Sequence, residues 1–341
     1  MNLKQLALHL GLSQTTVSRA LNGFPEVGER TRRRVLAAAE QFHYRPNASA
    51  RKLATGRAGA IGVVFSSDRN LLLDPIFTDF LAGVAARSAE SDTDVLVSSA
   101  LGDEADTYRR LARAHSVDAV ILSMPREEDP RVSLLHRLAL PVVVHGRTES
   151  KLPYAHLDID NEGAFRRATE MLADLGHRRI GLINGDTAFT FALHRERGWR
   201  EALAARGFAV SAELGRAGQM TEESGYRFAR LLLEFEAPPS ALLCSSIFAA
   251  LGAMRAIRDL GLAIGRDVSI VAHDDGLAAV RPETLTPALT TTFSSIRAAG
   301  ARIAEIAAAL AAGADPASLH EVWPVDIVFR GSTLPPPERA S

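Results

Sequence analysis

The chain has 341 residues and a formal net charge of −1, and its 47% hydrophobic residues suffice for the cores of two or three domains. Its one cysteine, Cys244, excludes an internal disulfide framework and a cysteine-ligated zinc cluster. No run of about 18 apolar residues occurs, and the N-terminus lacks the apolar run of a signal peptide, so we expect a cytoplasmic protein without a membrane span.

The charge is distributed unevenly along the chain. Residues 1–57 carry ten Lys or Arg and three Glu, a net charge of +7, whereas the remainder carries −8. Such asymmetry is typical of a basic module that binds a polyanion and is joined to an acidic body. Composition alone is equally compatible with an ordinary solvated charged face.

The first 42 residues predict three short helices. Apolar residues recur at helical spacing over residues 3–10, and Gly11 suits the end of a helix. Ser13 is placed to cap a second helix over residues 14–21, and a third is expected over residues 29–42. Two short helices joined by a tight glycine turn make a helix-turn-helix.

The second of these helices presents hydrogen-bonding side chains on its outer face. Val17 and Leu21 point inward in this arrangement. The outward residues are small polar side chains and one arginine: Gln14, Thr15, Ser18 and Arg19. These residue types suit base edges and phosphates in a DNA major groove. On the third helix we expect four apolar residues to face the core: Val35, Leu36, Ala39 and Phe42.

The run from Ser13 to Gly23, followed by Tyr44-Arg45-Pro46-Asn47-Ala48, resembles the DNA-binding headpiece of the LacI/GalR family of bacterial transcription regulators. The resemblance implies that bases are contacted at the start of the recognition helix and that phosphate contacts position it. The implied base contacts are Gln14 and Thr15, with Arg19 facing the groove. The implied remaining contacts are Thr16, Ser18, Asn22, Tyr44 and Asn47.

Residues 47–54 resemble the hinge helix of the same family, which orders on the operator. Leu53 stands where the family places a leucine wedge that enters the minor groove. Ala50 and Ala54 are small where the hinge helices of two subunits would touch.

From residue 60 onward, buried strands alternate with amphipathic helices in two series. The first series has strands over 61–65, 94–97, 119–122 and 141–144, and helices over 77–90 and 108–114. The second has strands over 180–183, 241–244 and 269–272, and helices over 163–175, 195–206 and 249–260. This pattern predicts two doubly wound parallel-sheet subdomains with a ligand cleft between them.

Motifs for enzymatic chemistry do not stand out. The sequence has no dinucleotide glycine fingerprint, P-loop, Gly-x-Ser-x-Gly elbow or paired histidines at zinc spacing. His273-Asp274-Asp275 has no visible partner cluster. We therefore expect no enzyme activity, no cofactor and no metal.

The resemblance extends over most of the body. Five segments match family landmarks in order: 74–77, 157–161, 175–180, 251–256 and 287–291. It implies the fold of periplasmic sugar-binding proteins, closing around a small effector. Arg195, aligned through Gly198-Trp199, takes the place of the ligand-contacting arginine, and Asp274 that of the acid that accepts from a ligand hydroxyl.

Other candidate effector contacts are Phe77, Phe191 and Ser246. The two rings are as compatible with the core as with a sugar face, and the alternative for Arg195 and Asp274 is that they pair with each other or with surface charges. Departures from the family pattern, at Ser245-Ser246, His273 and residues 293–295, fall around the cleft. His145-Gly146-Arg147 and residues 292–295 resemble members associated with α-glucoside catabolism.

The sequence thus predicts an all-α headpiece over 1–45, a hinge helix and linker over 46–58, and an α/β effector-binding and dimerisation body over 59–341. The expected function is a dimeric, nucleoid-associated repressor of sugar-catabolism genes, released from a pseudo-palindromic operator by a small carbohydrate. Residues 331–341 lack the leucine-rich tail of tetrameric relatives, which favours a homodimer. Two alternatives stay open: the effector is a corepressor, or the chain is a sugar sensor whose headpiece does not function.

Overall fold

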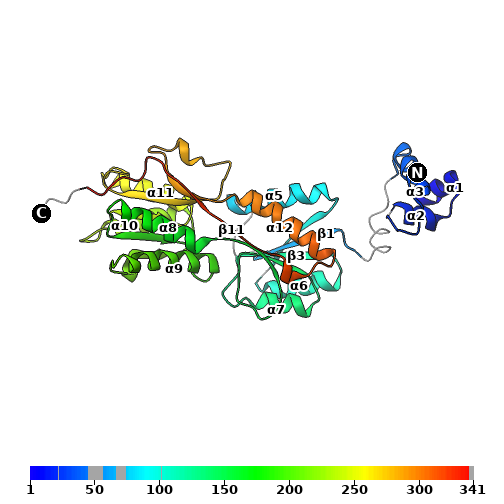
Figure 1. Cartoon of the computed structure of the whole chain (residues 1–341), viewed down its shortest axis with the longest axis horizontal. Coiled ribbons are helices and arrows are strands. Elements are labelled where there is room, and N and C mark those ends of the chain that lie inside the picture. The colour runs from blue at the N-terminus through cyan, green and yellow to red at the C-terminus, as the bar shows by residue number, and fades with distance from the viewer. Residues whose placement is uncertain (22, 45–56, 67–73, 101, 338–341) are drawn as a thin grey trace. The chain divides into compact units, whose positions relative to one another are not determined.

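The computed structural model describes residues 1–21, 23–44, 57–66, 74–100 and 102–337, which form two compact units (Figure 1). One unit comprises residues 1–59 and 115–118, and the other contains the rest. In the first unit the Asp118 carboxylate accepts the backbone N–H groups of Ala58 and Gly59, both at 2.7 Å. None of the helices that the structure describes is long and apolar enough to cross a membrane.

The first unit contains the three predicted helices, which we call the headpiece: α1 (Leu3–Leu10), α2 (Gln14–Leu21) and α3 (Glu29–Gln41). Helix α1 begins with a reciprocal cap, in which Asn2 accepts from the Gln5 N–H and the Gln5 side chain accepts from the Asn2 N–H. This cap satisfies N–H groups that the first turn of a helix leaves without partners.

The headpiece core corrects one of the expected inward positions, Leu36, and confirms the others: Val17, Val35 and Ala39 are buried, and Leu21 and Phe42 pack partly against them. Val17 and Val35 are fully buried, whereas Leu36 is 47% exposed. Neighbouring residues on a helix lie about 100° apart, so α3 buries Val35 together with Ala38 and Ala39 and turns Leu36 outward.

The second unit, the body, contains two six-stranded sheets, confirming the predicted α/β class. Lobe A has strand order β11-β5-β4-β3-β1-β2 and is parallel throughout. Its strands are β1 (Ala60–Ser66), β2 (Asp94–Ala100), β3 (Ala119–Ser123), β4 (Val142–His145), β5 (Ala155–Ile159) and β11 (His320–Trp323). Its helices are α5 (Pro75–Glu90), α6 (Glu104–Arg113), α7 (Pro130–Arg137) and α12 (Ile296–Ala311).

Lobe B has strand order β12-β10-β9-β8-β6-β7, with β12 antiparallel to β10 at one edge. Its strands are β6 (Ile180–Asn184), β7 (Gly215–Ala217), β8 (Ala241–Cys244), β9 (Ser269–Asp274), β10 (Thr290–Phe293) and β12 (Asp326–Val328). Its helices are α8 (Asn161–Asp174), α9 (Thr190–Ala205), α10 (Glu222–Leu233) and α11 (Ile247–Asp259).

The two series of strands and helices seen in the sequence suggested that each lobe is one continuous stretch of chain. In the structure the lobes are not continuous. Helix α12 and strand β11 follow lobe B in sequence but belong to lobe A, and β12 then returns to lobe B. Helices α5 and α12 pack through glycines: a Cβ at Gly83 would lie 2.0 Å from the Arg297 carbonyl oxygen, and one at Gly300 would lie 2.2 Å from that of Phe80. The chain thus passes between the lobes three times: from β5 to α8, from β10 to α12 and from β11 to β12.

Candidate functional site

Helix α2 presents its polar residues on the surface of the headpiece. Gln14, Thr15 and Arg19 are exposed, whereas Thr16 and Ser18 are half-buried. The Ser13 hydroxyl accepts the Thr16 N–H at 3.0 Å and lies 2.8 Å from the Thr16 hydroxyl, which secures the start of the helix. An exposed amide, hydroxyl and guanidinium on one rigid helix form a surface suited to base edges and phosphates.

Two headpiece arginines bind the headpiece's own backbone. Arg32 donates to the Phe24 carbonyl at 2.8 Å, and Arg34 donates to the Leu10 carbonyl at 3.0 Å. Arg19 and Arg30 are exposed. Part of the positive charge that the sequence assigned to a polyanion therefore stabilises the fold.

Tyr44 packs partly against the headpiece core, and its N–H donates to the Ala39 carbonyl at 2.8 Å. Burial raises the pKa of its phenol. The structure thus places Tyr44 at the end of α3, where its ring stabilises the headpiece. The other predicted DNA contacts, at Asn22, Asn47, Ala50, Leu53 and Ala54, lie outside the described residues.

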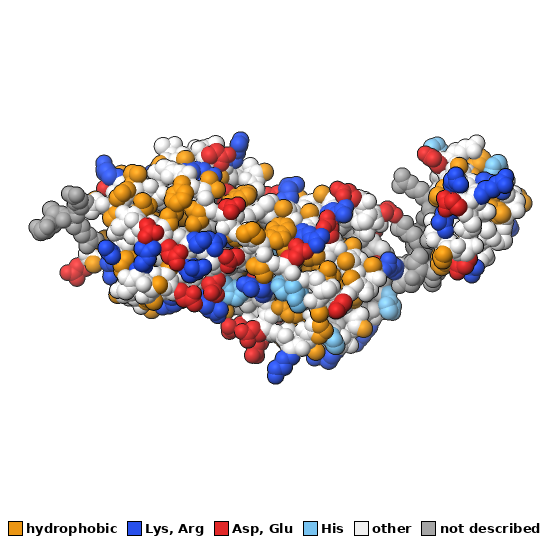
Figure 2. Space-filling model, in the orientation of Figure 1, with side chains coloured by type: hydrophobic (Ala, Val, Ile, Leu, Met, Phe, Trp, Pro, Cys, Tyr) orange, Lys and Arg blue, Asp and Glu red, His pale blue; other side chains and the backbone are white. Residues whose placement is uncertain are grey.

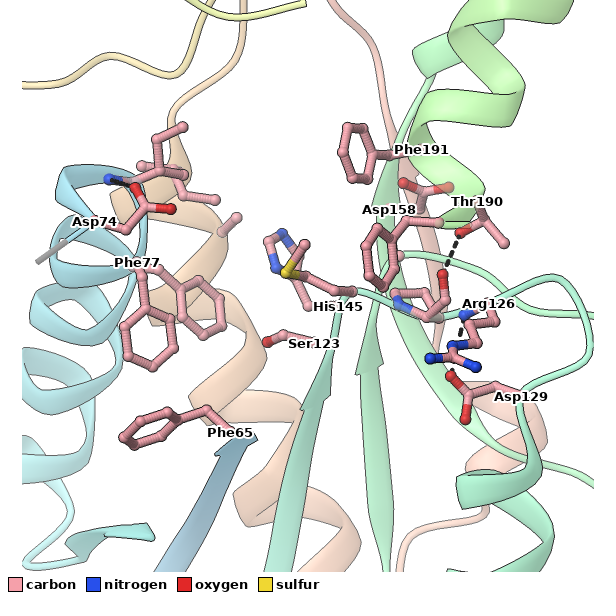
Figure 3. Close-up of a pocket in the computed structure, with 18 of the residues that line it drawn as sticks. Phe65, Asp74, Phe77, Ser123, Arg126, Asp129, His145, Asp158, Thr190 and Phe191 are labelled. Atoms are coloured by element: carbon pink, nitrogen blue, oxygen red, sulfur yellow. Dashed lines mark hydrogen bonds between the residues drawn. The ribbon is translucent and has the colours of Figure 1, made fainter. Parts of the chain in front are cut away.

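A cavity of about 740 Å³ lies between lobes A and B. Its polar lining comes mainly from residues at or just after the carboxyl ends of the strands, where ligands of parallel sheets usually bind. These residues are Ser66, Ser123, His145, Asp158, Asn161, Ser245 and Asp275. In Figure 3, Asp74 and Phe77 face the cavity from one side, and Asp158, Thr190 and Phe191 from the other.

Arg195 lines the cavity from α9 and is 5% exposed. Its Nε donates to the Asn161 side-chain oxygen at 2.8 Å, and its Nη1 donates to the Ser245 carbonyl at 2.6 Å. The guanidinium carbon lies 5.1 Å from the ring centre of Phe165 and 5.2 Å from that of Phe191. Burial lowers the pKa of Arg195 to about 10, although the charges of Asp275 and Asp158 oppose this, so the group stays cationic at neutral pH.

A chain of polar contacts holds Arg195 to lobe A. Asp158 accepts from Arg147 Nε at 2.7 Å and from the Asn161 side-chain amide at 3.2 Å, and Asn161 in turn accepts from Arg195. Among the described residues, no carboxylate oxygen lies within 4 Å of the Arg195 guanidinium. The alternative that Arg195 pairs with Asp274 does not hold in this structure.

Asp274 does not line the cavity, and the acid that does is its neighbour Asp275. Strand β9 extends through Asp274, which pairs with Phe293 of β10, and the Asp274 carboxylate accepts the Gly276 N–H at 2.9 Å. Because successive side chains leave a strand on opposite faces, this register turns Asp275 toward the cavity.

Ser246 is also outside the cavity lining. Its hydroxyl caps α11 by accepting the Ala249 N–H at 3.1 Å and donates to the Met220 carbonyl at 3.3 Å. Its neighbour Ser245 lines the cavity, and its hydroxyl donates to the Asn184 side-chain oxygen at 2.6 Å. The polar groups at this turn orient Arg195 and the start of α11.

Phe77 and Phe191 both line the cavity, as the sequence suggested. The Phe77 ring lies 5.8 Å from that of Phe65, and the Phe191 ring lies parallel to that of Phe189 at 6.4 Å. Phe77 is almost fully buried by its neighbours, while Phe191 is half-buried and covers Arg195.

The lobes also touch directly at one side of the cavity. The Thr190 N–H and the Thr190 hydroxyl both donate to the Pro125 carbonyl, at 3.0 Å and 3.3 Å, and the hydroxyl contact is drawn in Figure 3. Gly146 makes this approach possible: its φ is +109°, and a Cβ there would lie 2.8 Å from the Pro125 ring. A larger residue at 146 would force Pro125 away from Thr190.

The lining carries more carboxylates than cations. Among the described residues, six carboxylates line the cavity, at Asp74, Asp103, Glu104, Asp129, Asp158 and Asp275, against three guanidiniums, at Arg126, Arg131 and Arg195. Two of these acids, Asp129 and Glu104, pair with Arg131 at 2.7 and 2.8 Å. On the body surface, by contrast, Figure 2 shows acidic and basic side chains interspersed.

Sequence reasoning missed His145, Asn161 and Asp275 as lining residues. Each ends a strand or lies within two residues after one, so the general position of ligand sites in parallel sheets was the available signal. The exact strand ends, which decide between adjacent residues, depend on pairing with neighbouring strands.

Comparison with known proteins agrees with this architecture. Residues 2–47 match the family model "Bacterial regulatory proteins, lacI family", and residues 169–333 match "Periplasmic binding protein-like domain". The HTH-type transcriptional regulator AglR of Rhizobium meliloti (strain 1021) is 49% identical over 99% of this chain and 96% of its own.

Solved structures show the same fold over almost the whole chain. The Lac repressor dimer bound to operator and the anti-inducer ONPF is 27% identical, with a TM-score of 0.79 over 98% of this chain and 99% of its own. The CelR–cellobiose complex is 27% identical, with a TM-score of 0.70 over 97% of this chain and 99% of its own. The chain therefore belongs to the LacI family of bacterial regulatory proteins and is a DNA-binding transcription regulator.

Proposed function

We propose that this protein is a dimeric repressor of genes for carbohydrate use, and that a neutral sugar of disaccharide size, bound between lobes A and B, releases it from its operator. The observation that carries this proposal is the cavity around Arg195. The buried guanidinium, together with Asp158, Asn161 and Asp275, provides donors and acceptors that suit vicinal hydroxyls.

The charge and size of the cavity narrow the effector class. Because carboxylates outnumber guanidiniums among the lining residues that the structure describes, the cavity favours a neutral polyol over a sugar phosphate or a uronate. Its volume of about 740 Å³ lies in the upper part of the range of about 300–1,000 Å³ for ligand sites. A disaccharide fits this volume better than a single hexose, and the related CelR structure contains cellobiose.

The headpiece supports the DNA side of the proposal. Gln14 and Thr15 are exposed on a short helix and would contact bases, with the exposed Arg19 facing the groove. Thr16 and Ser18 would contact phosphates. Two copies would place two such helices on the half-sites of a pseudo-palindrome, as expected for a two-fold symmetric dimer. We assign residues 1–45 to this module, 46–58 to a hinge and linker with Leu53 as the wedge, and 59–341 to the body, which would act on the nucleoid in the cytoplasm.

Release requires the effector to bind two states of the body unequally. A sugar that contacts Asp158 of lobe A and Arg195 of lobe B changes the free energy of closing the lobes. We infer that closure is coupled to loss of the operator-bound arrangement.

The test begins with selection of genomic fragments by the purified protein without ligand, followed by sequencing. We expect a pseudo-palindrome, whose affinity is then measured by fluorescence anisotropy with cellobiose, other neutral disaccharides, glucose and glucose 6-phosphate. A neutral disaccharide should weaken operator binding and glucose 6-phosphate should not. Tighter binding with sugar would identify a corepressor, and failure to recover any fragment, with or without sugar, would contradict the repressor.

A further inference from the structure

His145 ends strand β4 and lies at the floor of the cavity. Its ring lies parallel to that of Phe80 of α5, with centroids 4.7 Å apart and planes 11° from parallel. Figure 3 shows His145 between the side of the cavity formed by Asp74 and Phe77 and the side formed by Asp158 and Phe191. One face of the imidazole is therefore covered by an aromatic ring, and the side chain borders the space that a ligand would occupy.

His145 is half-buried, and its ring nitrogens differ from those of the two fully buried histidines, His177 and His273. His177 lies 2.8 Å from the Ser240 hydroxyl and 3.0 Å from the Leu334 carbonyl through its two nitrogens, and His273 contacts the Thr292 and Ser294 hydroxyls. For His145, no described residue forms a hydrogen bond with either nitrogen. Because His145 borders the cavity, a ligand bound there would bury these nitrogens, and polar groups are normally hydrogen-bonded once they are buried, so the nitrogens are suited to a ligand.

The surroundings of His145 favour a hydroxyl as that ligand group. Burial lowers the pKa of His145, against the opposing charges of Asp158 and Asp275, so the ring is neutral at pH 7. A neutral imidazole has one donor and one acceptor nitrogen, and a sugar hydroxyl also donates and accepts. The Phe80 stack fixes the plane of the ring and hence the direction in which these groups point.

We propose that His145 is a specificity-determining residue of the effector site, whose imidazole, held flat against Phe80, exchanges a hydrogen bond with one hydroxyl of the bound sugar. This inference rests on the proposed carbohydrate effector. A sugar that lacks that hydroxyl leaves the imidazole without a partner in the closed cavity. We expect such an analogue to bind about 10- to 100-fold more weakly than the parent sugar.

The experiment measures affinity by isothermal titration calorimetry for the full-length protein. The probes are the tightest-binding disaccharide of a panel that includes cellobiose, and the monodeoxy derivatives of that disaccharide. The variant His145→Phe keeps a flat ring on Phe80 but has no nitrogen, and His145→Gln keeps polar groups without the ring. Phe80→Leu keeps the imidazole and removes its stacking partner, so it tests whether the stack positions the ring.

For wild type we expect one monodeoxy derivative to bind about 10- to 100-fold more weakly, and for His145→Phe we expect it to bind as the parent does. The two changes, His145→Phe in the protein and removal of one hydroxyl from the sugar, form a double-substitution cycle. Loss of discrimination means that the two changes are energetically coupled, and a general loss of protein stability would not produce that coupling. His145→Gln should retain part of the discrimination, and Phe80→Leu should reduce it. Operator binding without sugar shows that each variant is folded.

Full discrimination by His145→Phe would overturn the role of His145 while leaving the sugar effector intact. Binding of none of the neutral sugars by wild type would overturn the proposed effector, and the role of His145 with it. The two failures are therefore distinguished by the wild-type titration.

Discussion

The DNA-binding surface of the headpiece is built from consecutive residues, whereas the cavity is built from residues far apart in the chain. The recognition surface lies on α2, eight consecutive residues whose outward positions follow from the period of a helix. The cavity gathers side chains from residues 64 to 299, contributed by both lobes. A surface on one helix can be derived from local sequence, whereas a cavity depends on where strands end and how distant elements meet. It follows that substitutions should separate DNA binding from effector binding.

Salt should separate the two functions most strongly. For six to ten phosphate contacts, operator affinity should fall by about 10³- to 10⁵-fold between 50 and 200 mM salt, because counterions are released on binding. Affinity for a neutral effector should change little over the same range. Anisotropy and calorimetry across a salt series measure both. A flat profile for the operator would remove the phosphate contacts from the proposal.

Loss of Arg195 should abolish the response to effector and spare the operator. In Arg195→Ala the Asn161 oxygen and the Ser245 carbonyl lose their donor, and we expect at least about a 100-fold loss of effector affinity. Arg197→Ala is the control, since Arg197 lies on the same helix and pairs at the surface with Glu162. Equal effector affinity in wild type and Arg195→Ala would exclude Arg195 from the site.

Loss of Gln14 or Thr15 should have the reverse effect. Each contact to a base edge contributes about 1–3 kcal/mol of discrimination, so Gln14→Ala should weaken specific operator binding by about 10- to 100-fold. Effector affinity should not change. Gln41→Ala, at an exposed position near the end of α3, is the control. Unchanged sequence preference in Gln14→Ala and Thr15→Ala would exclude both as base contacts.

The register at the end of β9 allows a comparison of adjacent acids. Asp275→Asn should lower effector affinity by about tenfold, because its carboxylate lines the cavity. Asp274→Asn should mainly change the midpoint of thermal unfolding, because the Asp274 carboxylate closes the turn at Gly276. The opposite pattern in calorimetry and thermal melts would restore Asp274 as the effector acid.

The smallest expected effect concerns stability and pH. Burial lowers the pKa values of His145, His177 and His273. The unfolded chain, with an ordinary histidine pKa of about 6.5, then binds more protons than the folded body as the pH falls below that value. The contribution of these histidines to the free energy of unfolding is therefore fully present above about pH 6.5 and is lost on acidification. Calorimetry should give a melting temperature several degrees lower at pH 5.5 than at pH 7.5, and a higher value at pH 5.5 would contradict this reading.

Much of the fold could be predicted because it is encoded locally. The three headpiece helices, the buried strands β1, β3 and β8, and the end of α1 at Gly11 all follow from periodicity and capping. Leu36 was misplaced because two adjacent apolar residues compete for one inward position, and packing of α3 against α1 and α2 decides between them.

The sequence by itself determined the helix-turn-helix with its outward Gln14 and Thr15, the alternating α/β pattern of the body, and Arg195 as a candidate effector contact. Only the tertiary structure decided that α12 and β11 complete lobe A, that Asp275 and Ser245 rather than Asp274 and Ser246 line the cavity, and that His145 borders it. The physical reason is the range of the interactions. Capping and helical periodicity act within a few residues, whereas strand register and cavity lining are set by pairing and packing between segments far apart in the chain.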